Sequence, residues 1–399
     1  MTTLQSPAHK RIYSIDILRG LVMIIMALDH SRDMFHAQAF TDEPTNLATT
    51  TPFLFFTRFI THYCAPVFIF LAGISAYLQS LRKSKNELSA FLIKRGIWLV
   101  FIEIVVITFG WTFNIHYNTI ILQVIWAIGW CMILMGGMIR LRLNLILITG
   151  LILVLGHNLL DYTTVMQNRT AGFLFDALFR GNFSKYALDA HHTILLVYPI
   201  LPWAGLMFLG YYAGKLFDVS VDAKKRKRIL NYTGLGLIAV FILLRTVDVY
   251  GDPSHWSEQK NGIYTFLSFI NVTKYPPSLL FMCITIGPAL LFLSAMEKVN
   301  NKLSSIIITY GKVPFFYYVI HFFILHAIAM MLFFNRGYSY QDGLKDIPGF
   351  PFKFMRPGEG YGLGMVYLIW FLTVLILYPL CKWFSNYKAK HKHWWLSYF

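Results

Sequence analysis

Long apolar runs dominate this chain and leave few folds open to it. About ten stretches of roughly 18 to 25 mostly apolar residues recur along its length, each long enough to cross a bilayer as a helix. Of the 399 residues, 56% are hydrophobic and 14% charged, with a mean hydropathy of +0.54. A soluble domain could not cover that apolar surface, so we predict an all-α polytopic membrane protein. The predicted spans are 15–36, 56–80, 95–113, 119–139, 143–160, 193–216, 229–247, 277–297, 313–334 and 362–385.

Lysine and arginine predict the orientation of these spans. If the N-terminus is cytoplasmic, the inside segments carry about 21 Lys and Arg and the outside segments about 9, which favours N-in, C-in topology. This asymmetry explains most of the formal net charge of +16 without a nucleic-acid partner. The basic run at 224–228 is then more typical of an anchor facing anionic lipid than of a specific phosphate site.

The connections differ in length on the two sides of the predicted membrane. Four outside connections, at about 37–55, 161–192, 248–276 and 335–361, are long and rich in Tyr, Trp, Asn, Gly and Pro, so we expect them to form a cap. We find no soluble stretch that could hold a core of its own, so residues 1–399 are interpreted as one membrane domain.

Several familiar site patterns are missing from the sequence. There is no Walker A loop, no HExxH and no CxxC, and the four cysteines fall in separate apolar segments. We therefore expect neither a metal site nor a disulfide framework. The paired broken helices typical of many transporters are also not found in matching halves of the chain.

The end of the first span concentrates charge where charge is expensive. Asp29, His30, Arg32 and Asp33 fall within five residues, and His36 follows. Asp33 lies three positions after His30 and four after Asp29, spacings that place side chains on one helix face. A carboxylate beside an imidazole fixes its tautomer and raises its basicity, as in general-base catalysis. The alternative is an ion-paired helix end, with Asp29 bonded to Arg32 and no chemistry.

Other spans carry isolated polar residues. Pro66 should disturb the helix at the carbonyl of His62 and kink the second span, with Arg58 one turn further out. His321 follows a Gly–Pro break in the ninth span, and Gln123 lies in the outer third of the fourth. Each of these features could instead be a packing kink or a hydrogen-bonded core residue.

The order of several motifs resembles a known family. The segments are SIDILRGLVMIIMALDH, THYCAPVFIFLAGISAYL, LIKRGIWLVFIEI, LQVIWAIGWCMIL, LPWAGLMFLGYYAGKLF, YGKVPFFYYVIH and YPLCKWFSNYK…WWLSY. Together they resemble the heparan-alpha-glucosaminide N-acetyltransferase catalytic-domain family, and more closely its bacterial membrane members. The Arg19-Gly pair followed by His30 is also similar to bacterial inner-membrane sugar O-acyltransferases.

The resemblance implies acetyl transfer across a membrane. Acetyl-CoA would bind from the cytoplasmic side as co-substrate, and a histidine in the outer half would deliver the acetyl group to a sugar amine or hydroxyl. The family's heparan enzymes carry their catalytic histidine in a His-x-x-Trp sequence after the first matching span, which this chain lacks. The catalytic role is therefore left open among His30, His36 and His62.

We assign roles to the polar residues on this basis. The expected catalytic residues are His30 as general base or acetyl carrier, Asp29 and Asp33 to orient it, and His62. The expected acceptor-binding residues are His36, Arg58, His321 and Gln123. The expected CoA-phosphate ligands are Arg19, Lys94 and Arg95.

The sequence and the resemblance also suggest partners and alternative functions for the protein. The partners are the lipid bilayer, most simply a bacterial inner membrane, and a sugar or glycan acceptor. No nucleic acid is expected, and a homodimer is left open. The alternative functions are a transporter or flippase for a polar solute or glycan, and a structural membrane protein.

Overall fold

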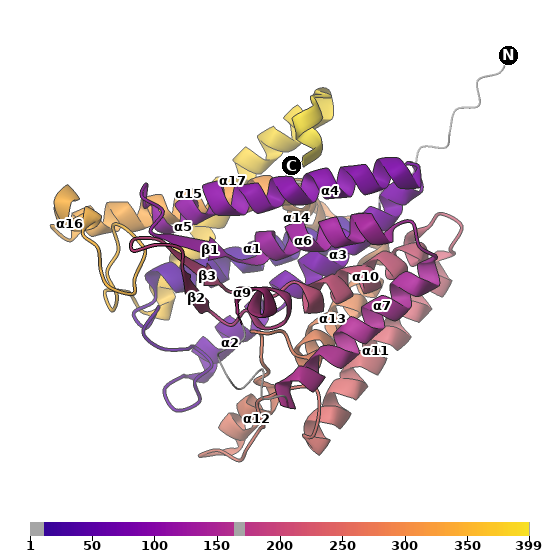
Figure 1. The fold of residues 1–399 in the computed structure, drawn as a ribbon, viewed down its shortest axis with the longest axis horizontal. Helices are drawn as coiled ribbons and strands as arrows, with labels where there is room; N and C mark the ends of the chain where they lie inside the picture. The colour runs from indigo at the N-terminus through magenta and orange to yellow at the C-terminus, as the bar shows by residue number, and fades with distance from the viewer. Residues whose placement is uncertain (1–11, 163–171, 399) are drawn as a thin grey trace.

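A computed structural model describes residues 12–162 and 172–398 as a mostly helical protein, so residues 163–171 of the predicted cap lie outside the described residues. Many of the helices run roughly alongside one another (Figure 1). Six helical segments in this part of the chain are long and apolar enough to cross a membrane. They are Pro52–Ser80, Leu143–Asp161, Ala223–Val247, Leu279–Lys298, Pro314–Asn335 and Leu363–Lys390.

Each predicted span coincides at least in part with a helix. The helices at these positions are α1 (Tyr13–Phe35), α2 (Pro52–Thr61), α3 (Cys64–Ser80), α4 (Lys85–Ile102), α5 (Thr108–Thr112), α6 (Val124–Met138), α7 (Leu143–Gly156), α10 (Leu201–Ala213), α11 (Ala223–Val247), α13 (Leu279–Ala295), α15 (Pro314–Asn335) and α17 (Leu363–Lys390). Shorter helices are α9 (Phe173–Phe175), α12 (Gly262–Ile270), α14 (Lys302–Gly311) and α16 (Tyr340–Leu344). A π-helical turn, Glu103–Ile107, joins α4 to α5.

Two predicted spans begin as strands, so the prediction of helix from 119 and from 193 was wrong. β1 (Thr119–Leu122) pairs in parallel with β3 (Thr193–Leu196), and β2 (Ser184–Ala187) pairs antiparallel with β3. β1 and β3 contain β-branched Thr and Ile, which favour extended backbone. The partner strands are far apart in the chain, so an apolar run read by length alone could not separate strand from helix.

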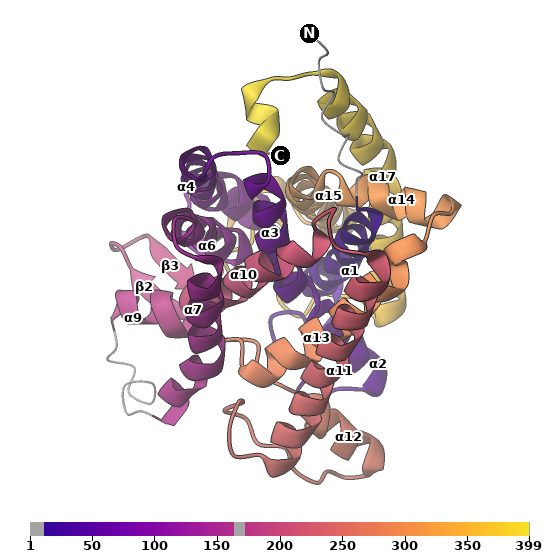
Figure 2. The same cartoon turned by 90° about the vertical axis from the view of Figure 1, so that its right-hand side faces the viewer.

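A buried glutamate marks the transition from β1 to α6. Glu103 is fully buried, and its Oε1 accepts a hydrogen bond from the backbone N–H of Gln123 at 2.8 Å. Gln123 is the N-cap residue of α6, so the carboxylate satisfies a backbone donor that the new helix leaves free. α6 packs along α4, and Figure 2 shows the two helices nearly end on beside each other.

The predicted kink in the second span is confirmed. α2 ends at Thr61 and α3 begins at Cys64, so the helical path breaks at His62, whose carbonyl the ring of Pro66 would obstruct. The small residues that follow let α3 pack closely along α10. A Cβ added at Gly210 would lie 2.2 Å from the carbonyl oxygen of Phe70.

We expect Gly210→Ala to destabilise the protein by about 1–3 kcal/mol, because the added methyl group must separate two packed backbones. The free energy of unfolding in detergent, measured with a chemical denaturant, checks this. Gly236→Ala in α11 is the matched control, since a Cβ there meets no atom within 4 Å. Equal stability of the two variants would contradict the close contact between α3 and α10.

Candidate active site

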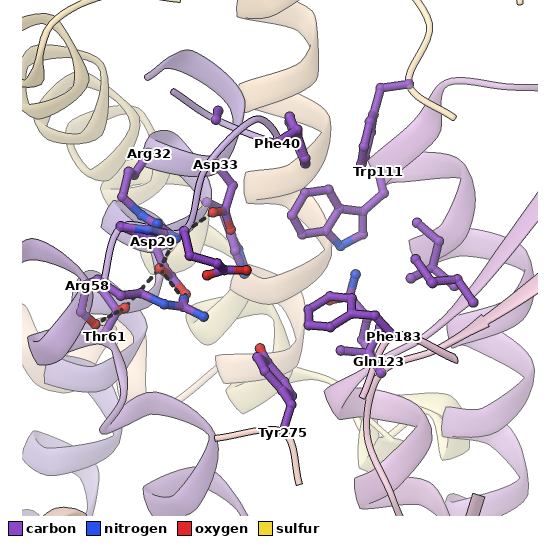
Figure 3. A pocket seen from close by; sticks show the side chains of 18 of the residues that line it. Asp29, Arg32, Asp33, Phe40, Arg58, Thr61, Trp111, Gln123, Phe183 and Tyr275 are labelled. Atoms are coloured by element: carbon purple, nitrogen blue, oxygen red, sulfur yellow. Dashed lines mark hydrogen bonds and ion pairs between the residues drawn. The ribbon is translucent and has the colours of Figure 1, made fainter. Parts of the chain in front are cut away.

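A cavity with a volume of about 790 Å³ lies at the C-terminal end of α1. One wall carries the charged residues of α1 and α2, and the opposite wall carries Trp111, Phe183 and Gln123 (Figure 3). The connection after α1 and the segment 348–357 contribute aromatic and proline side chains at its edge. The cavity therefore combines ionic groups with an apolar lining, as ligand sites commonly do.

Asp29 is the centre of a buried ionic cluster on the first wall. Arg58 Nη1 lies 2.8 Å from Oδ1 and 2.7 Å from Oδ2 of Asp29. Arg32 Nη2 donates to Asp29 Oδ1 at 2.8 Å and to Asp33 Oδ1 at 2.5 Å, and the Thr61 hydroxyl donates to Asp29 at 2.9 Å. Figure 3 shows these side chains converging from α1 and α2. Every acidic group in the cluster thus has a cationic partner, which buried charges require.

His30 forms a direct contact with a second histidine. Its Nδ1 lies 2.6 Å from Nε2 of His321, whose own Nδ1 lies 2.5 Å from the carbonyl oxygen of Tyr318. A carbonyl oxygen can only accept, so Nδ1 of His321 carries the hydrogen and its Nε2 is the acceptor when the ring is neutral. His30 therefore donates through Nδ1, and Nε2 of a neutral His30 keeps its lone pair.

The surroundings of His30 fix its ring and leave Nε2 available. The imidazole stacks on Phe322 with ring centroids 4.5 Å apart and meets the edge of Trp111 at 5.2 Å. His30 lines the cavity, and Nε2 has no hydrogen-bond partner among the described residues. The geometry is suited to a base that takes a proton from a ligand in the cavity.

The structure corrects the expected partner of His30. Asp29 and Asp33 were expected to orient its ring, but both carboxylates bond to arginines and Nδ1 of His30 faces His321 instead. Asp29 precedes His30 in the helix, so the two side chains leave α1 about 100° apart. The bond between Asp29 and Arg32, which belongs to the alternative interpretation of an ion-paired helix end, is present, but it lies beside an imidazole that faces the cavity.

The structure brings the four expected acceptor-binding residues to one place. Arg58, His36 and Gln123 line the cavity, and His321 lies buried behind His30. His62 does not line this cavity in the described structure. Its ring is buried against Phe59 and Phe281, with centroids 6.1 and 5.5 Å away.

The three residues expected at the CoA phosphates lie outside this cavity. Arg19 donates hydrogen bonds to Asp16, to Ser75 and to the carbonyl of Gly311. Arg95 donates to the carbonyl of Ser397 at 3.0 Å and lies within electrostatic reach of Arg19.

Lys94 contributes to a second, smaller pocket. This pocket has a volume of about 350 Å³, and its lining is mostly aromatic, with side chains from α4 and the C-terminal segment 394–398. Arg95 contacts the same C-terminal segment, so two of the three expected ligands lie where the middle of α4 meets the segment 394–398.

Several cavity residues gave no usable signal in the sequence. Trp111 and Tyr318 occur in ordinary aromatic-rich spans, and Lys274 and Tyr275 occur in a loop. The three cavity residues Phe40, Phe183 and Lys185 also come from connecting segments or a strand. No group of three His, Cys, Asp or Glu side chains is arranged as metal ligands within residues 12–162 and 172–398.

Comparison with known proteins identifies the family. The family model described as "Heparan-alpha-glucosaminide N-acetyltransferase, catalytic" matches residues 11–246, which is more than half of the chain. A search of curated proteins found no match. The matched segment contains His30 and the ionic cluster, whereas His321 lies beyond it. The resemblance predicted from the motifs is thus confirmed, and the chain belongs to the heparan-alpha-glucosaminide N-acetyltransferase catalytic-domain family, a family of transmembrane acetyltransferases.

Proposed function

We propose that this protein transfers an acetyl group from cytoplasmic acetyl-CoA to an amine or hydroxyl of a sugar or glycan on the outer side of the membrane, with His30 as the reacting histidine. The observation that carries the proposal is the contact between His30 and His321 beside a large cavity. It leaves Nε2 of His30 with a lone pair and no partner among the described residues. A polar group held that way in an apolar wall is suited to proton transfer.

The chemistry needs one proton to move. Nε2 of His30 takes the proton of the acceptor amine or hydroxyl, and the acceptor atom attacks the thioester carbonyl carbon. The tetrahedral intermediate then expels CoA as a thiolate, which receives the proton from His30. In the alternative order, Nε2 attacks the thioester carbonyl carbon and CoA leaves as a thiolate. The acceptor then attacks the acetyl group on Nε2, the bond to Nε2 breaks, and the acceptor's proton passes to the CoA thiolate. In both orders His321 holds the ring of His30 through Nδ1.

Aromatic residues at the cavity favour a sugar as the acceptor. Phe40 and Phe183 line the cavity, and each residue is 46% exposed. Both residues have left-handed backbone, with φ of 63° and 56°, which is costly for a residue with a side chain. The apolar C–H face of a sugar ring can stack on such rings while its hydroxyls reach polar groups deeper in the cavity.

The proposal includes a membrane arrangement. One domain of about ten spans with both ends inside would place the C-terminal end of α1 and a cap of connections at the outer face. Arg19 precedes His30 by eleven residues, about 16 Å along the helix, so it would approach the CoA side with Lys94 and Arg95. The bilayer would be a bacterial inner membrane, with no nucleic-acid partner and a homodimer as one arrangement.

Acetyl-CoA binding is the first test. The full-length protein in detergent should unfold at a higher temperature with acetyl-CoA, because a ligand at about 100 times its dissociation constant stabilises by roughly 2.7 kcal/mol. Acetate and ATP are the controls for the acetyl and nucleotide parts. Arg95→Gln should weaken the shift, since it removes one expected phosphate ligand.

Two results would contradict the proposal. One is the lack of a shift up to millimolar acetyl-CoA. The other is acetyl-CoA binding without transfer of radiolabelled acetyl to any amino sugar or glycan. Flux of a polar solute through vesicles containing the protein, without CoA, would favour the transporter instead.

A further inference from the structure

Lys274 is a buried cation that lacks a direct partner in the described structure. Lys274 is 8% exposed and lines the same cavity as His30. It forms no hydrogen bond or ion pair with any described residue, and its Nζ lies over the ring of Tyr275, 5.2 Å from the centroid. The other buried cations in the described residues all donate hydrogen bonds: Arg32, Arg58, Arg245 and Lys353.

The turn that carries Lys274 is held firmly. Asp252 is buried and accepts hydrogen bonds from the Thr273 backbone N–H at 2.8 Å, the Thr273 hydroxyl at 2.9 Å and the Ser278 hydroxyl at 2.6 Å. The backbone N–H of Ser278 closes the turn onto the carbonyl of Thr273 at 3.0 Å. Lys274 is therefore presented to the cavity by a fixed turn, which keeps the ordering cost low when a ligand binds.

The buried charges of the site are unbalanced, whereas the other charged residues that line the cavity, Asp42, Glu43 and Lys185, are not buried. Asp29 and Asp33 are already bonded to Arg32 and Arg58, and Lys274 adds a third cation to these two carboxylates. Lys274 lies within electrostatic reach of Asp29 and His30, so its charge acts on the reacting region. A buried ammonium without a hydrogen-bonded counter-charge is unfavourable, and a ligand with a negative group would supply one.

We propose that Lys274 binds an acidic group, a carboxylate, phosphate or sulfate, on the sugar that accepts the acetyl group. This inference rests on the proposed function, and it adds a specificity-determining residue from outside the segment that the family model matches. The acidic group would contact Lys274 while the reacting amine or hydroxyl faces Nε2 of His30. Stacking on the exposed ring of Phe183, which packs against Tyr275, would hold the same sugar.

The test compares two acceptors that differ by one acidic group. Glucosamine and glucosamine 6-phosphate are assayed with acetyl-CoA and the full-length protein. Wild type should prefer the phosphorylated sugar by about tenfold to hundredfold in kcat/KM, the usual effect of a charge-assisted hydrogen bond. Lys274→Met should remove this preference through a higher KM for the phosphorylated sugar, while Lys274→Arg should keep most of it.

Lys260→Met is the matched control. It removes an exposed lysine from the same connection, one that also lies over a tyrosine ring, and should leave the preference unchanged. Equal losses with both acceptors in Lys274→Met would overturn the inference, because Lys274 would then act on the reacting group or on the fold. A wild type without preference for the phosphorylated sugar would also overturn it.

A binding measurement separates this inference from the proposed function. Glucosamine 6-phosphate should raise the unfolding temperature of wild type more than glucosamine does, and this difference should vanish in Lys274→Met. If the difference appears but no acetyl is transferred, the acidic-group site stands and the acetyl-transfer proposal fails. If transfer occurs and the difference is absent, the acidic-group site fails and the transfer proposal stands.

Discussion

His30→Ala should lower acetyl transfer by about 10²–10⁴-fold, the usual contribution of a positioned general base, and by more if His30 carries the acetyl group. The variant should still bind acetyl-CoA and unfold cooperatively, because its expected defect is chemical. Radiolabelled acetyl transfer and thermal unfolding measure the two properties. Full activity in His30→Ala would remove His30 from the mechanism.

The same assay decides among the histidines that the sequence left open. His62→Ala should retain most transfer activity once its stability is taken into account, because its ring packs on Phe59 and Phe281 away from the cavity. His36→Ala should change KM more than kcat, since His36 lines the cavity and Nδ1 accepts only a weak backbone hydrogen bond at 3.3 Å.

His321 should behave as a positioning residue for His30. His321→Ala removes the acceptor that holds Nδ1–H of His30, so transfer should fall and the pH–rate profile should shift. In the double variant of His30→Ala and His321→Ala, the two losses of transfer activity should not add, because both residues act through the ring of His30. Additive losses, or an unchanged pH profile, would contradict this coupling.

Removing Arg58 should be the most destabilising single change at the site. Arg58→Met leaves the Asp29 carboxylate buried with one cationic partner fewer, and breaking a buried pair costs about 3–5 kcal/mol. The unfolding free energy in detergent measures this loss. Asp29→Asn combined with Arg58→Met should recover part of it, because the uncompensated charge is then gone.

An exposed ion pair provides the control for this experiment. Lys345 is bonded to Asp342 in the connection between α15 and α17, where its side chain is largely exposed, so Lys345→Met should leave unfolding unchanged. If Arg58→Met were as stable as Lys345→Met, the ionic cluster would not contribute to holding α2 against α1. Any loss of acetyl transfer in Arg58→Met would then reflect weaker ligand binding and not lower stability.

The sequence was sufficient for features that depend on neighbouring residues. Run length and composition located the helices, and Pro66 predicted the break between α2 and α3. The spacing along α1 predicted the contact between Asp29 and Arg32, because residues three apart meet on a helix.

The sequence was insufficient where partners are distant in the chain. β1 and β3 lie inside two apolar runs and are strands only because they pair with each other. Lys274 is one lysine in a connecting loop, and only the turn built on Asp252 places it at the cavity. Local patterns carry no information about which distant segment will pack beside them.

Residue order and tertiary packing determine different features of the site. The sequence alone determined that the end of α1 is charged and carries His30, since that follows from residue order in one helix. Tertiary structure decided which neighbour each charge takes. Arg58 arrives from α2 and adds to Arg32 on Asp29, while His321 arrives from α15 to contact His30. A buried carboxylate pairs with the cation that binds it most strongly. Arginine binds it more strongly than an imidazole does, because the charge of arginine is permanent and its guanidinium donates several fixed hydrogen bonds.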